Sequence, residues 1–152
     1  MNEPDVATLV VRRIIRATPE RLFAFWTEPE HLMRWWGPNG ASCPAAEIDL
    51  RAGGSYRIAN RFADGNVVWI AGVFEEIQRP HRLLYTWQLE KPAASRERVS
   101  VSFEPHGDMT QVIVTHERIA GAAARTSHER GWNGCLDGLA RYVGESARLG
   151  TP

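Results

Sequence analysis

The sequence predicts an α+β protein in which a curved antiparallel sheet of about six or seven strands surrounds one long C-terminal helix. Two short helix signals follow an apolar first strand, and six further stretches with an apolar period of two are separated by turn residues. Sequential hairpins imply antiparallel neighbours. The apolar face of such a sheet needs a cover, and the only long stretch with helical period is the last, at about residues 122–149.

The first strand is expected at residues 8–17, where valine and isoleucine are interrupted by arginines in a way typical of a half-exposed edge strand. Thr18 is a suitable N-cap for the helix that follows, and Pro19 suits its first position. A second short helix is expected from Thr27 and Glu30, which have the spacing of a capping box.

The centre of the chain is predicted to consist of strands, since apolar and polar residues alternate there between turn residues. Asp64 and Gly65 form a hairpin signal, and Gly72, inside an apolar stretch, indicates a β-bulge. The expected strands cover residues 42–50, 56–62, 66–77, 83–89, 99–103 and 112–116.

The final helix presents one apolar stripe, with charged residues on its other side. Gly131, Gly134 and Gly138 each lower its intrinsic helicity by about 1 kcal/mol relative to alanine. A helix that tolerates them must gain from close packing, so we expect sheet strands to approach its backbone at these positions. The stripe consists of His128, Trp132, Leu136, Leu139 and Val143.

The length fits a single domain over residues 1–152, with a core at about 8–147. Basic and acidic residues both number 18, so no global charge favours nucleic acid. No membrane span and no signal peptide are expected, because long apolar runs are missing. Cys43 and Cys135 fit no zinc or redox motif and indicate a reducing compartment, so a cytoplasmic location is expected.

Several segments resemble, in order, the motifs of one family. They are Ala17–Phe23, Leu32–Pro38, Asp49–Tyr56, Pro80–Trp87, Val114–Glu117 and His128–Trp132 followed by Leu136. Through them the chain resembles the START-like (SRPBCC, helix-grip) superfamily and, within it, the family similar to the C-terminal domain of the activator of heat-shock-protein-90 ATPase. The resemblance implies a helix-grip fold with a small-molecule cavity between the sheet and the long helix.

The cavity that the resemblance implies would be lined by inward-facing residues. Alternation favours inward positions for several strand aromatics, and Asn60 and His116 are polar residues in phase with apolar neighbours. Such groups either satisfy one another's hydrogen bonds or orient a ligand. The expected lining residues are Trp26, Trp35, Trp36, Tyr56, Ile58, Asn60, Phe62, Trp69, Tyr85, Trp87, Val101, Phe103, Val114, His116, His128, Trp132 and Leu136.

The sequence contains no recognisable catalytic or metal-binding motif. The histidines lack the spacing of metal ligands, so neither a metal nor a cofactor is expected. His116 and His128 are the candidate general acids or bases, because imidazole titrates near neutral pH.

Three functions remain as hypotheses. The first is a binding protein for a small hydrophobic or aromatic molecule, without catalysis. The second is a cyclase, dehydratase or hydrolase that uses the same cavity, and the third is a chaperone-associated protein–protein module. We favour the first because the chain has six tryptophans and lacks a catalytic motif. A monomer or a homodimer is expected, the latter paired through the apolar edge strand.

Overall fold

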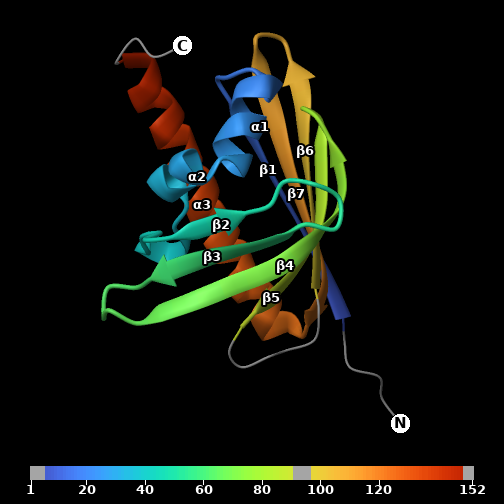
Figure 1. Ribbon diagram of the computed structural model, residues 1–152, viewed down its shortest axis with the longest axis vertical. Helices are drawn as coiled ribbons and strands as arrows, with labels where there is room; N and C mark the ends of the chain where they lie inside the picture. Colours follow the sequence, from blue (N-terminus) through green and yellow to red (C-terminus); the bar gives the residue numbers. More distant parts are fainter. Residues whose placement is uncertain (1–5, 91–96, 149–152) are drawn as a thin grey trace.

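In residues 6–90 and 97–148, which the computed structural model describes, the chain forms a seven-stranded antiparallel sheet that curves around one long helix (Figure 1). This confirms the predicted α+β helix-grip architecture. The elements are β1 (Val6–Ile15), α1 (Pro19–Thr27), α2 (Pro29–Trp35), the 3₁₀ turn η1 (Pro38–Gly40), β2 (Ala46–Ile48), β3 (Ser55–Arg61), β4 (Val67–Gln78), β5 (Arg82–Leu89), β6 (Glu97–His106), β7 (Met109–Ala120) and α3 (Ala122–Arg148).

The strand order is β1-β7-β6-β5-β4-β3-β2. Consecutive hairpins therefore build a meander from β2 to β7, and β1 returns to pair with β7. β1 lies at an edge of the sheet, as its mixture of apolar residues and arginines indicates. The long helix α3 contacts β1, β7, α2 and η1, and the buried side chains of these layers form one apolar core.

The first helix begins as the sequence predicts. Pro19 is its first residue, and the hydroxyl oxygen of Thr18 accepts a hydrogen bond from the backbone N–H of Arg21 at 3.2 Å. The capping box predicted for the second helix is wrong. Thr27 is the last residue of α1, and its hydroxyl donates to the carbonyl oxygen of Phe23 at 2.8 Å. Among the described residues, α2 therefore begins without a side-chain cap.

The strand expected at residues 42–50 is much shorter in the structure. Only Ala46–Ile48 pair continuously with β3, and Ser42 forms one isolated bridge. Pro44 lies between them and has no N–H to donate to a neighbouring strand, which explains the interruption.

The hairpin turn predicted at Asp64 and Gly65, between β3 and β4, is confirmed. Gly65 has a φ of 86°, a conformation that favours glycine.

The expected bulge at Gly72 is also wrong. Gly72 stays in register with β3, and the irregularity between β4 and β5 lies between Phe74 and Glu76. A Cβ atom at Gly72 would lie 1.9 Å from the carbonyl oxygen of Thr86. The glycine is therefore required by the close approach of β5, which a strand pattern alone does not reveal.

Gly131 and Gly138 of α3 accommodate the short helical segments rather than sheet strands, which corrects the expectation from the sequence at these two positions. A Cβ atom at Gly138 would lie 2.4 Å from the carbonyl oxygen of Trp35 at the end of α2. One at Gly131 would lie 3.3 Å from the side chain of Pro38 in η1. These contacts fix α2 and η1 against α3, next to the pocket described below.

Gly138→Ala is expected to lower the free energy of unfolding by about 1–3 kcal/mol, because the added methyl group would overlap a backbone carbonyl. Gly144→Ala in the same helix is the matched control. Its Cβ atom would meet no atom of the described residues within 4 Å, so higher helix propensity should raise the free energy of unfolding by up to about 1 kcal/mol. Urea denaturation measures both changes, and equal effects would contradict the close approach of α2 to α3.

Candidate functional site

A pocket of about 280 Å³ lies between the first half of α3 and strands β3, β4 and β5. Its wall is mainly aromatic and aliphatic, with a few polar groups. Pockets of this composition are the usual form of small-molecule sites. The lining residues are Trp36, Pro38, Asn60, Phe62, Val68, Ile70, Trp87, Leu89, His116, Ser127, His128, Gly131, Trp132 and Cys135.

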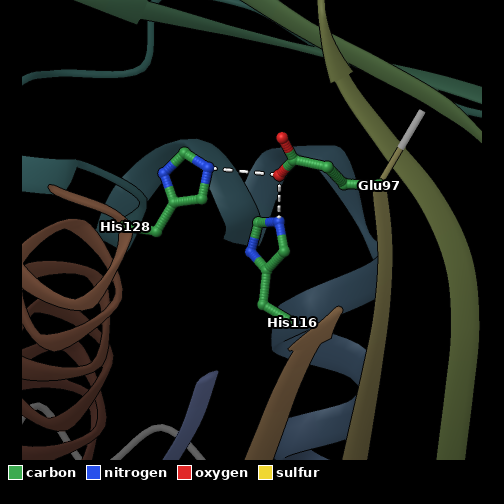
Figure 2. A group of neighbouring side chains, drawn as sticks. All are labelled: Glu97, His116 and His128. Atoms are coloured by element: carbon green, nitrogen blue, oxygen red, sulfur yellow. Dashed lines mark hydrogen bonds and ion pairs between the residues drawn. The ribbon is translucent and has the colours of Figure 1, made fainter. Parts of the chain in front are cut away.

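Beside this pocket, Glu97, His116 and His128 form a hydrogen-bonded cluster (Figure 2). The Oε1 atom of Glu97 lies 2.6 Å from Nε2 of His116 and 3.1 Å from Nε2 of His128. The two imidazole rings stack with their centroids 4.7 Å apart. Trp132 completes the cluster, because its indole N–H donates to Nδ1 of His116 at 3.0 Å.

Strand alternation and helical period bring these side chains together. Glu97 is the first residue of β6 and is in phase with the buried Val99, which lies opposite His116 on β7. His128 and Trp132 are one turn apart on α3, and both line the pocket. The sequence prediction omits Glu97 because it begins this strand at Val99. One further step of the same alternation reaches the carboxylate.

Trp132 determines which nitrogen of His116 carries the ring proton. An indole N–H can only donate, so Nδ1 of His116 must accept, and the proton of the neutral ring is on Nε2. That Nε2–H donates to the ionised carboxylate of Glu97. Both nitrogens of His116 are thus committed, and protonating Nδ1 would place two N–H groups against each other.

Burial and hydrogen bonding reinforce this protonation state. Burial lowers the pKa of His116 because desolvation disfavours the charged ring, although the hydrogen bond to Glu97 opposes the shift. For Glu97, burial acts to raise the pKa, but the hydrogen bonds from His116 and His128 outweigh it and hold the pKa below its ordinary value. A neutral His116 beside an ionised Glu97 is therefore the stable combination.

The same side chains resemble a zinc ligand set, since two imidazole nitrogens and a carboxylate oxygen lie within 4.8 Å of one another. A histidine that binds a metal through Nε2 carries its proton on Nδ1 and donates it to an acceptor. At His116 the neighbour of Nδ1 is the N–H donor of Trp132. The arrangement therefore suits a hydrogen-bonded proton network better than a metal centre.

His128 is the member of the cluster that reaches the pocket with a nitrogen still available. Its Nε2 is committed to Glu97, while Nδ1 lies on the side of the ring away from Glu97 (Figure 2) and makes no hydrogen bond within the described residues. The His128 side chain is 18% exposed, whereas that of His116 is fully buried. Trp87 packs against both rings, with centroids 4.8 Å from His116 and 5.0 Å from His128.

The structure distributes the residues expected to line a cavity over several environments. The pocket contains one group of them: Trp36, Asn60, Phe62, Trp87, His116, His128 and Trp132. A second group surrounds a separate void of about 20 Å³, enough for one water molecule: Trp26, Tyr56, Ile58 and Tyr85. A third group is fully buried in the core: Val101, Phe103, Val114 and Leu136.

Two expected residues lie elsewhere. Trp35 lines a polar groove between α2 and α3, and its indole N–H donates to the carbonyl oxygen of Phe25 at 2.9 Å. Trp69 lies on the other face of the sheet, where the Arg57 guanidinium is 4.0 Å from its ring centroid. Sequence reasoning also missed the small and aliphatic residues of the pocket wall, because nothing in their pattern separates a wall from a core: Pro38, Val68, Ile70, Leu89, Ser127, Gly131 and Cys135.

Comparison with known proteins identifies the family. The family model described as Activator of Hsp90 ATPase homolog 1-like protein matches residues 16–144. The chain belongs to this family. Among curated proteins, none shows significant sequence similarity to it.

Solved structures of similar proteins share the fold of this family member. The AHSA1 protein from Silicibacter pomeroyi is 25% identical with a TM-score of 0.83, over 92% of this chain and 99% of that one. A protein from Chromobacterium violaceum is 26% identical with a TM-score of 0.81, over 88% of this chain and 94% of that one. None of the helices described here combines the length and apolarity needed to cross a membrane.

The buried, neutral His116 predicts a loss of stability in mild acid. The unfolded chain takes up a proton at this histidine below about pH 6.5, whereas the folded protein resists it because burial lowers the pKa of His116. The free energy of unfolding should therefore fall as pH drops below about 6.5, with a slope of up to about 1.4 kcal/mol per pH unit from this group.

His116→Gln should flatten this fall, because glutamine does not titrate and can still donate to Glu97. His106→Gln is the control, since His106 is exposed and its replacement should leave the slope unchanged. Urea denaturation between pH 7.5 and 5 (roughly the range over which an imidazole titrates) compares the three proteins. An unchanged slope in His116→Gln would contradict the neutral, buried ring.

Zinc is expected to leave the thermal stability of this family member unchanged. Occupying Nε2 of His116 would force its proton onto Nδ1, against the N–H of Trp132. Melting curves with a small molar excess of Zn²⁺ test the expectation, and His128→Gln shows whether any effect comes from this cluster. A zinc-dependent rise in Tm that His128→Gln abolishes would contradict the hydrogen-bond assignment.

Proposed function

We propose that this member of the Activator of Hsp90 ATPase homolog 1-like family binds a small apolar or aromatic molecule in the pocket beside α3. The observation that supports this best is the pocket itself, with its volume of about 280 Å³ and its mainly aromatic and aliphatic wall. A dry, apolar cavity of roughly 150 Å³ holds a benzene molecule. The pocket of this protein therefore has room for a molecule with two fused rings.

The tryptophans of the wall favour a flat ligand. Trp36 and Trp132 meet edge to face with centroids 5.5 Å apart, and the Trp87 ring packs against His116 and His128. Aromatic rings attract one another in offset-stacked and edge-to-face geometries and bury large apolar areas. A planar apolar molecule that enters the pocket would extend this aromatic packing.

The polar groups of the wall support a ligand with one polar end. Asn60 holds the wall together, because its Oδ1 accepts from the Trp36 indole N–H at 2.8 Å and its amide donates to the carbonyl oxygen of Val68 at 3.1 Å. His128 has an imidazole nitrogen that no described residue engages. A few placed polar groups in an apolar pocket are what fixes the orientation of a bound molecule.

A chaperone-associated role has support from the name of the family alone. The pocket, by contrast, has a definite volume and chemistry. Ligand binding is therefore the function that the geometry supports best.

Val68→Phe is expected to weaken the binding of 2-methoxynaphthalene by about tenfold or more, because the larger side chain would occupy the pocket. Val67→Phe is the matched control, since Val67 is on the other face of β4 and is 39% exposed. Isothermal titration calorimetry measures both affinities. A loss in both variants, or in neither, would contradict binding in this pocket.

Native mass spectrometry of freshly purified protein, compared with a denatured sample, tests the proposal without a chosen probe. A non-covalent adduct that disappears on denaturation would support it and give the mass of a bound molecule. A bare protein mass together with no measurable binding of the naphthalene probe would count against it.

A further inference from the structure

We propose that the pocket takes a hydroxylated aromatic molecule, and that Nδ1 of His128, with the Glu97 carboxylate behind it, accepts the proton of the ligand's hydroxyl group. This inference rests on the proposed function, because it names the chemical class of molecule that the same pocket binds. It goes beyond binding, because it assigns a general base to the site.

The direction of its hydrogen bond to Glu97 leaves His128, which lines the pocket, with a nitrogen that can accept a hydrogen bond. Glu97 accepts from Nε2 of His128 at 3.1 Å, so the proton of the neutral ring is on Nε2 and the lone pair is on Nδ1. Nδ1 points away from Glu97 (Figure 2), and no described residue donates to it. A ligand that satisfies this nitrogen must supply a donor, which a hydroxyl group does and an ether or a plain hydrocarbon does not.

Of the other polar groups that line the pocket, His116 and Asn60 already have partners. The indole N–H of Trp87 has none among the described residues, but it is a donor and cannot take a proton. His116 accepts from Trp132 at Nδ1 and donates to Glu97 at Nε2. Asn60 is bonded to the Trp36 indole and to the backbone of β4. His128 is thus the group of the cluster that lines the pocket and also has a nitrogen able to take a proton.

The charge of the cluster argues against an acidic ligand. The hydrogen bonds from two histidines hold the pKa of Glu97 below its ordinary value, so its negative charge lies directly behind His128. A carboxylate in the pocket would be repelled by that charge and would lose its hydration in an apolar wall. A neutral hydroxyl group avoids both penalties, and the aromatic wall selects the ring that carries it.

The proton transfer is balanced within the site. The O–H bond of the ligand breaks, its electron pair stays on the oxygen, and the proton binds the lone pair of Nδ1. The resulting imidazolium keeps its Nε2–H on Oε1 of Glu97, whose negative charge stabilises it. The corresponding activity is general-base activation of a phenol or an enol. His128 acts on the ligand, and Glu97 is a positioning residue.

The test uses two probes of nearly equal size, 2-naphthol and 2-methoxynaphthalene, which differ in the hydroxyl proton. The wild-type protein should bind 2-naphthol about tenfold more tightly, the value of one hydrogen bond of about 1.4 kcal/mol. His128→Phe keeps a ring stacked on His116 but offers no lone pair, so it should bind both probes equally. His106→Phe, at an exposed position, should keep the preference. Isothermal titration calorimetry gives the affinities.

Fluorescence of bound 2-naphthol shows whether its hydroxyl proton has been transferred. Excited 2-naphthol is a strong acid, and its anion emits at longer wavelength than the neutral form. With protein in excess, the wild type and His106→Phe should show anion emission, and His128→Phe should show emission of the neutral form. Glu97→Gln should reduce the share of anion emission from bound 2-naphthol, because the positive charge formed on His128 would lose its carboxylate partner.

The possible failures are distinguishable. If both naphthalenes bind equally to the wild type and bound 2-naphthol emits as the neutral form, the assignment of His128 is overturned while ligand binding stands. Anion emission that persists in His128→Phe would likewise overturn it, because another group would be the acceptor. If neither probe binds, both the inference and the proposed function fail.

Discussion

The site depends on one hydrogen bond, the donation from the indole N–H of Trp132 to Nδ1 of His116 at 3.0 Å. Because an indole cannot accept, this bond gives the whole chain of groups a direction. His116 must donate to Glu97, and Glu97 must stay ionised to accept. The same carboxylate oxygen then orients His128. Three elements, α3, β7 and β6, contribute to a network in which each bond determines the next.

The position of Trp132 is in turn determined by how α3 docks on the rest of the fold. Its ring stacks on Trp26 of α1, with centroids 6.1 Å apart, and meets Trp36 edge to face. Further along α3, Arg13 of β1 pairs with Asp137 at 2.6 Å on the other side of the helix. The helix is thus held from both sides, and the pocket remains in the space that its first half does not fill. The docking of α3 therefore determines both the position of Trp132 in the hydrogen-bond network and the space left for the pocket.

The sequence predicts which face of a strand or helix each residue lies on better than it predicts which residues are in contact. Period-two alternation places His116 inward, and helical period places His128 and Trp132 on one stripe, because both periods are local properties of the chain. Alternation does not say which inward residues meet, since that depends on strand register and on the docking of α3. Glu97 shows the limit most clearly, because its partners are 19 and 31 residues away. Trp69 shows it too, since on the other face of the sheet it packs against Arg57.

Stability alone is a poor explanation for the cluster. A buried ionic network contributes little more than well-packed apolar residues of the same volume would, because desolvation of the charge offsets most of the attraction. A purely structural network would also be closed, with each nitrogen and oxygen paired inside the core. In the described part of this protein the network is closed at Trp132 and His116 but open at His128, which lines the pocket. The negative charge of Glu97 lies behind this open histidine, where it would stabilise a proton taken from a hydroxyl group of a bound ligand. The open end of the network therefore connects the fold to proton transfer.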